Sequence, residues 1–172
     1  ISCNHDQNPD YARRLIEMAK SADADMVKIQ CYVADEMTND KENYLIKGGT
    51  PWDGRHLHTL YEHGQTDEEM VTNMFTHAKR VGIPIFSSVF SIRGLALLEA
   101  LECPIYKIAS FENNDYDLIR QVSTSGKPIV VSTGMASDKD LLKIKDAVSN
   151  IAKLSYMHCI SAYPTYTHEA NI

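Results

Sequence analysis

Short apolar runs recur along the chain, and each of them ends at polar residues. Five such runs end, in chain order, at Lys28 and Gln30; Ser87 and Ser88; Lys107, Ser110 and Glu112; Ser132 and Thr133; and His158 and Ser161. Runs such as 24–29 and 104–109 are typical of strands that are buried on both faces, where an unpaired ammonium group is costly. The two lysines therefore suggest a bound anion.

Helical patterns separate these runs. Residues that commonly cap or begin helices precede the patterns, and Gly82 is expected to end the helix that starts near Thr66. The expected caps are Asn8, Thr66 with Glu69, Ser91, Asp115, and Ser137 with Asp140. The alternation of strands and helices predicts an α/β protein with a parallel sheet.

The carboxyl ends of parallel strands form the working face of such a protein, and the polar residues lie at those ends. With a further strand end near Ser2-Cys3-Asn4, the pattern amounts to about six strands, whereas a TIM-type (β/α)8 barrel needs eight and typically about 250 residues. The sequence therefore predicts an incomplete barrel with its last two strands missing. Residues 1–172 are expected to be one partial domain of a longer protein.

The segment from Val33 to Gln65 is too long for a routine connection. It contains the turn-rich stretch 48–54, which includes Trp52, the one tryptophan of the chain. A functional loop and a surface excursion anchored by Trp52 are both compatible with this pattern.

Composition excludes several function classes. The formal charge is −6 over 172 residues, and no cluster of basic residues indicates a nucleic-acid surface. No apolar stretch is long enough to span a bilayer and no signal peptide pattern opens the chain, so we expect no membrane partner and a cytoplasmic location. The four cysteines are far apart, which favours reduced thiols over zinc or disulfides.

The polar residues at the strand ends allow more than one chemistry. Lys28 and Gln30 are two positions apart in the expected strand, so their side chains point to the same face. Lys28 or Lys107 could bind phosphate or carboxylate, form a Schiff base, or simply reach solvent or a carboxylate, with Glu112 as the candidate partner of Lys107. Hydroxyl groups at Ser88, Ser110, Ser132 and Thr133 could donate to phosphate oxygens.

Two histidines and a glycine accompany these residues. His158 is interpreted as a histidine of the core, whereas His5, beside Asn4, is as compatible with a ligand or a base as with a structural role. Gly134 would let the backbone approach a ligand closely.

Taken together, the strand-end motifs resemble the sialic acid synthase family. The motifs are Asn4-His5, 27–30, 86–90, 106–112, 127–135 and 161–165, and they cover essentially the whole chain. Within that family, the loop 48–55 and Leu60-Tyr61-Glu62 are most similar to the pseudaminic acid synthases. N-acetylneuraminate and legionaminate synthases remain alternatives.

The resemblance implies a transferase that condenses phosphoenolpyruvate with the open-chain aldehyde of an N-acetylated amino sugar, giving a nonulosonic (sialic-type) acid and phosphate. It implies catalytic roles for Lys28, Lys107 and Glu112, with Lys107 on the substrate carboxylate. Lys28, Ser88, Ser110 and Ser132 would hold the phosphate, and Gln30, Glu112 and Tyr163 would face the sugar. Asn4 and Ser161 would also bind substrate, although the family commonly has Asn in place of Ser161.

The resemblance also implies parts that residues 1–172 do not contain. Two histidines on the seventh and eighth strands would bind a divalent metal, Mn or Mg, and a small C-terminal domain that resembles antifreeze proteins would complete a homodimer. The piece alone is therefore expected to be inactive. A Schiff-base aldolase and a noncatalytic remnant of a barrel are the alternatives from other classes.

Overall fold

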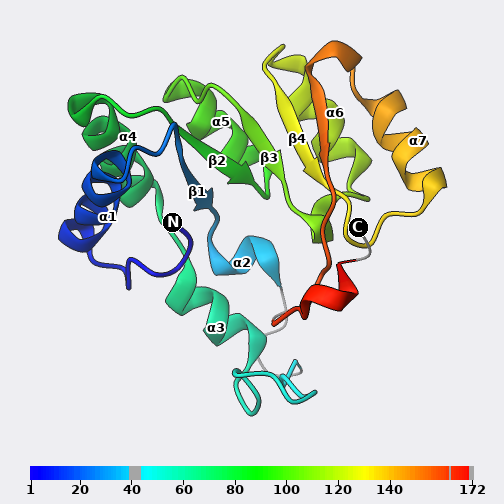
Figure 1. The fold of residues 1–172 in the computed structure, drawn as a ribbon, viewed down its shortest axis with the longest axis horizontal. Coiled ribbons are helices and arrows are strands. Elements are labelled where there is room, and N and C mark those ends of the chain that lie inside the picture. Colours follow the sequence, from blue (N-terminus) through cyan, green and yellow to red (C-terminus); the bar gives the residue numbers. More distant parts are fainter. Residues whose placement is uncertain (39–43, 163, 171–172) are drawn as a thin grey trace. The chain divides into compact units, whose positions relative to one another are not determined.

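The computed structural model describes residues 1–38, 44–162 and 164–170 (Figure 1). Its internal contacts divide the chain into two compact units, Ile1–Cys103 and Pro104–Ile172. Both units are built from parallel strands and helices, which confirms the predicted α/β class. No helix in the described ranges is long and apolar enough to cross a membrane.

The first unit contains one pair of parallel strands. Strands β1 (Val27–Cys31) and β2 (Ile85–Val89) pair in register from Val27 opposite Ile85 to Cys31 opposite Val89. The helices are α1 (Pro9–Ser21), α2 (Ala34–Met37), α3 (Leu57–Gly64), α4 (Glu68–Val81) and α5 (Ile92–Ala100).

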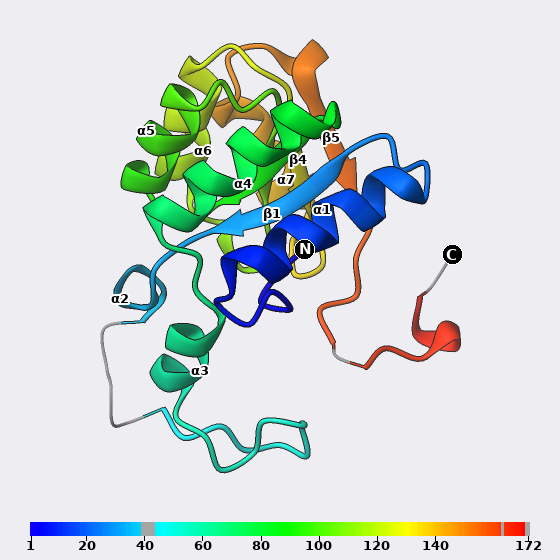
Figure 2. The same cartoon turned by 90° about the vertical axis from the view of Figure 1, so that its left-hand side faces the viewer.

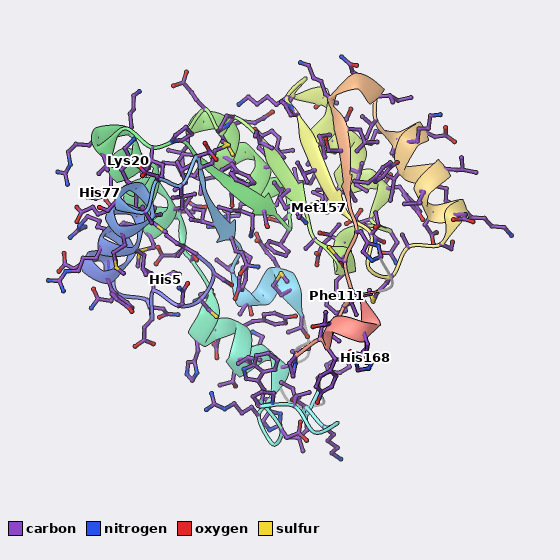
Figure 3. All side chains as sticks on the ribbon, viewed as in Figure 1. His5, Lys20, His77, Phe111, Met157 and His168 are labelled. Carbon is purple, nitrogen blue, oxygen red and sulfur yellow. The ribbon has the colours of Figure 1, made fainter. Side chains whose placement is uncertain are left out.

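Helices α1 and α4 lie side by side in both ribbon views (Figures 1 and 2). Ile16 of α1 and Val71 and Met74 of α4 are fully buried, so these helices bury apolar faces. The side chain of His77 is also buried; Figure 3 labels it on α4, and its Nε2 lies 2.9 Å from Oε1 of Glu17 on α1. A polar contact between the buried His77 and the half-exposed Glu17 therefore joins the two helices.

Most of the expected helix caps are confirmed. The side chains of Asn8, Ser91, Asp115 and Ser137 each accept a hydrogen bond from a backbone N–H of the first turn, and Ser137 forms the predicted capping box with Asp140. Gly82 ends α4 with a φ of 78°, a conformation that favours glycine.

The cap predicted at Thr66 is wrong. Asp67 caps α4 by accepting a hydrogen bond from the Met70 N–H at 2.8 Å. The hydroxyl of Thr66 instead lies 3.0 Å from Nε2 of His5, a long-range contact that local sequence does not reveal.

The strand end expected near Ser2-Cys3-Asn4 is not found: residues 1 and 2 have no regular structure, and residues 3–7 form a bend and a turn. The Ile1 nitrogen donates to the Lys28 carbonyl at 2.7 Å, but the Ser2 N–H turns back to the Asn4 side chain, and the Asp6 N–H bonds to the Cys3 carbonyl. Local hydrogen bonds thus hold residues 2–6. The described residues contain five strands, where the sequence suggested about six.

The second unit contains three parallel strands. They are β3 (Tyr106–Ile108), β4 (Ile129–Ser132) and β5 (Leu154–Met157), with β4 paired to both of the others. Helices α6 (Tyr116–Thr124) and α7 (Asp138–Ala147) accompany them, together with the 3-10 helices η1 (Ser110–Glu112), η2 (Ile151–Lys153) and η3 (Thr167–Glu169). Its fully buried side chains include Ile108, Ile119, Val131 and Ile144.

The interpretation of His158 as a core histidine is wrong. Strand β5 ends at Met157, labelled in Figure 3, so His158 lies beyond the strand and is exposed. Its Nε2 lies 2.7 Å from the Ala170 carbonyl oxygen, which follows η3.

The connection between β1 and α4 contains α2, α3 and a turn-rich loop. Asp53 organises that loop: its carboxylate accepts hydrogen bonds from the N–H groups of Gly48, Gly49 and Thr50 and from the Thr50 hydroxyl. These bonds lower the pKa of Asp53 to about 2. Trp52 is 38% exposed, so the anchor of this loop is Asp53 rather than Trp52.

Candidate active site

In the first unit, Lys28 and Gln30 share one face of β1, as predicted. Burial alternates along the strand: Val27, Ile29 and Cys31 are buried, and the two polar residues between them are half-buried. The parallel register places Gln30 opposite Ser88, which is 2% exposed. Because paired residues of a parallel ladder point to the same face, Lys28, Gln30 and Ser88 share that face.

The ammonium group of Lys28 forms no ion pair with the residues that the structure describes. Burial lowers the pKa of Lys28, because the charged form loses hydration. The alternative in which this lysine pairs with a protein carboxylate is therefore not observed. An anionic ligand would supply the missing counter-charge.

Neighbouring polar groups surround these residues. The Ser2 hydroxyl donates to the side-chain amide oxygen Oε1 of Gln30, and the Asn4 side chain accepts from the Ser2 N–H at 2.9 Å. Ser87, although adjacent to Ser88, has a structural role, since its hydroxyl bonds to the carbonyls of Ile29 and Ser88.

His5, labelled in Figure 3, is buried with both ring nitrogens engaged. Its Nε2 contacts the Thr66 hydroxyl at 3.0 Å, and its Nδ1 accepts from the Gln7 N–H at 3.0 Å. Burial lowers the pKa of this imidazole. A structural role therefore accounts for His5, and neither nitrogen is left to bind a metal or act as a base.

In the second unit, Lys107 and Ser132 form a buried polar pair. Lys107 is 7% exposed, and its ammonium group donates to the Ser132 hydroxyl and to the Ile108 carbonyl, the latter at 2.9 Å. The Cys159 thiol donates to the same hydroxyl at 3.2 Å. The hydroxyl of Thr133, by contrast, bonds to the Met157 carbonyl at 3.0 Å and holds the backbone after β4.

Glu112 ends η1 as a largely buried carboxyl group. Its Oε2 is buried and has no hydrogen-bond partner among the described residues. Burial raises the pKa of Glu112 to about 7, and a hydrogen bond from its own backbone N–H and the charge of Lys107 only partly offset this effect. The carboxyl group can therefore either give or take a proton near neutral pH. Phe111, labelled in Figure 3, is exposed beside it.

Two serine side chains and one backbone carbonyl lie close to Gly134, just after β4. Its N–H donates to the Ser110 hydroxyl at 3.3 Å. A Cβ atom at this position would lie 2.4 Å from Oγ of Ser161 and 3.0 Å from the Cys159 carbonyl oxygen. Oγ of Ser161 is itself buried without a hydrogen-bond partner in the described part of the chain. The glycine is thus required by close packing around two of the predicted serines.

Sequence reasoning missed Asn113. This side chain is 3% exposed, and its amide group donates to the Ser132 carbonyl at 3.2 Å. It therefore fixes the end of β4 where the Lys107 contact is made. An amide that bonds to a carbonyl 19 positions away leaves no local pattern to detect.

The structure thus brings Lys107, Ser110, Ser132 and Ser161 into one cluster of the second unit, and Lys28, Gln30 and Ser88 onto one face of the first. Tyr163 lies outside the described residues. No group of three or more His, Cys, Asp or Glu side chains in residues 1–38, 44–162 and 164–170 could hold a metal ion. The described residues therefore do not fit a divalent-metal site.

Relatives of known function share much of this sequence. The pseudaminic acid synthase of Helicobacter pylori is 40% identical over 178 residues, which cover 100% of this chain and 52% of that protein. The N,N'-diacetyllegionaminic acid synthase of Campylobacter jejuni is 28% identical, with 98% and 52% covered. The chain spans about half the length of the curated relatives it matches.

A solved structure shows the same fold. The crystal structure of an N-acetylneuraminic acid (sialic acid) synthetase from Leptospira borgpetersenii superposes with a TM-score of 0.85 at 23% identity, covering 98% of this chain and 55% of that one. The model of the NeuB family matches residues 15–172, a range that includes every strand described above. The chain therefore belongs to the NeuB family.

Proposed function

We propose that the protein containing this chain is a transferase that condenses phosphoenolpyruvate with an N-acetylated amino sugar to give a nonulosonic acid, as a pseudaminic acid synthase does. The observation that carries the proposal is the buried Lys107–Ser132 pair, together with the largely buried carboxyl group of Glu112. The higher identity to pseudaminic acid synthases than to a legionaminic acid synthase supports the subgroup. N-acetylneuraminate or legionaminate synthesis is the alternative within the family.

The proposed reaction forms a carbon–carbon bond and breaks a carbon–oxygen bond. C3 of the enol attacks the aldehyde carbon, whose oxygen takes up a proton, and water adds at C2. The bond between C2 and the bridging oxygen then breaks, which releases phosphate and leaves a 2-keto acid. Such chemistry needs cationic and hydroxyl contacts for a highly charged substrate and a group that moves protons near neutral pH.

We assign these tasks to the residues within each unit. In the first unit, Lys28 and Ser88 contact phosphate, and Gln30 and Asn4 contact the sugar. In the second unit, Lys107 contacts the carboxylate of phosphoenolpyruvate, Ser110 and Ser132 contact phosphate, and Ser161 contributes a hydroxyl group. Glu112 moves the proton and, with Tyr163, faces the sugar. Among the described residues, the Lys28 ammonium forms no ion pair and Oε2 of Glu112 and Oγ of Ser161 have no hydrogen-bond partner, which supports these roles.

The proposal extends to parts beyond residues 1–172. We propose a TIM-type (β/α)8 barrel to which the described residues contribute five strands, followed by an antifreeze-like C-terminal domain in a homodimer. A divalent metal, Mn or Mg, would be held outside this chain. The chain's coverage of about half of its relatives supports the larger assembly, and the isolated piece is expected to be inactive.

A Schiff-base aldolase is the second candidate, and the environment of Lys28 favours it. Burial lowers its pKa, which would increase the fraction of neutral, nucleophilic amine. Borohydride reduction in the presence of pyruvate separates the candidates. The synthase should leave no covalent lysine adduct by mass spectrometry, and an adduct on Lys28 or Lys107 would establish the aldolase.

The direct test uses the protein encoded by the complete gene, supplied with Mn or Mg. Phosphoenolpyruvate is mixed with each of several N-acetylated amino sugars, and phosphate and sugar acid are measured together. We expect one sugar to give equal amounts of both products, with pseudaminic acid as the acid formed. Release of neither product with any sugar would favour a noncatalytic role.

A further inference from the structure

Three aromatic rings meet beyond the carboxyl ends of β1 and β2. The ring of Tyr32 contacts the ring of Phe90 edge-on, with centroids 5.5 Å apart and an interplanar angle of 69°. It contacts the ring of Tyr61, from α3, in the same manner at 5.8 Å and 82°. We refer to Tyr32, Tyr61 and Phe90 as the aromatic cluster.

The register of the strands relates this cluster to the proposed sugar contact. Gln30 pairs with Ser88, and Tyr32 and Phe90 each lie two residues further along. Because side chains alternate along extended backbone, positions two apart project to the same side. The contact between Tyr32 and Phe90 agrees with this placement. Tyr32 and Phe90 therefore continue the face that carries Lys28, Gln30 and Ser88, and Tyr61 joins them through its contact with Tyr32.

The members of the cluster differ in accessibility. Tyr32 is buried, and burial raises the pKa of its hydroxyl to about 12, so that it stays neutral. Close packing holds it: a Cβ atom on Gly64 would lie 2.8 Å from its hydroxyl oxygen. Tyr61 is half-buried and comes from a helix rather than a strand. Tyr32 thus supports the cluster, and Tyr61 offers ring surface.

We propose that Tyr61 determines specificity by packing its ring against the methyl group of an acetamido substituent of the amino sugar. This inference rests on the proposed function and adds a residue to its sugar site. An acetamido group combines a polar amide with an apolar methyl group. Gln30 can bond to the amide, and the ring of Tyr61, which contacts Tyr32 two residues beyond Gln30, provides the apolar surface that the methyl group requires.

Because Tyr61 lies in a helix rather than in a strand, specificity for the sugar can change without any change in the strands. It lies in the long connection that contains α2 and α3, whereas Lys28, Gln30 and Ser88 lie in the paired strands. Substitutions in α3 can therefore reshape the apolar surface and leave the phosphate contacts in place.

The test compares variants of the protein encoded by the complete gene. Steady-state constants are measured for two sugars that differ only in the acyl group on nitrogen, acetyl or formyl, the latter lacking the methyl group. Loss of one apolar contact of this size is worth about tenfold or more in discrimination. We expect Tyr61→Ala to raise KM for the acetylated sugar by about tenfold and to abolish its preference over the formylated sugar.

The KM for phosphoenolpyruvate should stay within about twofold of wild type. Tyr61→Phe and Tyr61→Leu retain apolar volume and should keep most of the preference, which also provides variants if Tyr61→Ala fails to fold. Tyr11→Ala, which removes an exposed tyrosine of α1, is the matched control and should change nothing.

Two results overturn the inference while leaving the proposed function intact. One is an unchanged preference in Tyr61→Ala, or a loss of the preference in Tyr61→Phe and Tyr61→Leu, which retain the apolar surface; the other is an equal rise of both KM values, which marks a structural role. Absence of sugar-acid formation by wild type with every sugar would refute the proposed function and this inference together.

Discussion

The ammonium group of Lys107 on β3 donates a hydrogen bond to the hydroxyl of Ser132 at the end of β4, 25 positions further along the chain. Pairing of β3 with β4 brings the two residues together, and the Asn113 amide holds the Ser132 carbonyl at the same strand end. A cation and a hydroxyl are thereby fixed in a buried place, where both can act on an anion without further ordering.

Replacing Lys107 should weaken binding of phosphoenolpyruvate. Removing a well-placed charged contact costs about 2 kcal/mol or more, or roughly a thirtyfold rise in Kd. Calorimetric titration of the full-length Lys107→Met variant measures this change, and Lys139→Met, an exposed lysine of α7, is the control. Wild-type affinity in Lys107→Met would show that the carboxylate assignment is wrong.

Glu112 should make stability depend on pH. Burial raises its pKa from 4.5 to about 7, so the folded protein binds more protons than the unfolded chain between these values. The stabilising effect of the neutral carboxyl group is therefore complete below about pH 4.5 and is lost as the pH rises through about 7, a change on the order of 3 kcal/mol.

Urea unfolding across this pH range measures the effect. The free energy of unfolding of Glu112→Gln should fall less steeply with pH than that of wild type, because the amide cannot ionise. Glu99→Gln, at an exposed position of α5, should retain the wild-type slope. Identical slopes in wild type and Glu112→Gln would mean that this carboxyl group titrates normally.

Asn113 should be required for the position of Ser132. In Asn113→Leu the Ser132 carbonyl loses its amide donor in a buried place, which costs about 1–3 kcal/mol of stability. The KM for phosphoenolpyruvate should rise as well, because the Ser132 hydroxyl is displaced. Asn114→Leu changes an exposed neighbour and should do neither. Equal effects of the two substitutions would argue against this role.

Gly134→Ala tests the close packing after β4. The new Cβ would lie 2.4 Å from the Ser161 hydroxyl oxygen, so overpacking should cost about 1–3 kcal/mol. In the double variant Gly134→Ala/Ser161→Ala the nearest atom is removed, and thermal unfolding should show partial recovery. No recovery would mean that the Cys159 carbonyl, 3.0 Å from the same Cβ, dominates the clash.

Local patterns predicted the features that local physics determines. Asn8, Ser91, Asp115 and Ser137 cap helices because a short polar side chain reaches N–H groups two or three residues away. The shared face of Lys28 and Gln30 follows likewise from the extended backbone of β1, in which side chains alternate between faces.

Features that depend on distant residues were missed. Thr66 does not cap α4 because His5, 61 positions earlier, engages its hydroxyl. Asn113 acts on a carbonyl of another strand, and Asp53, rather than the more conspicuous Trp52, organises its loop by bonding to three N–H groups. Such contacts leave no periodic signal in the sequence.

The most direct test of the account follows the bridging oxygen of phosphoenolpyruvate. The protein from the complete gene is incubated with the amino sugar and with phosphoenolpyruvate that carries heavy oxygen between C2 and phosphorus, and the released phosphate is analysed by mass spectrometry. If the C2–oxygen bond breaks, as in the proposed mechanism, the phosphate retains the heavy oxygen. Unlabelled phosphate, with the label in the keto group of the sugar acid, would contradict that mechanism.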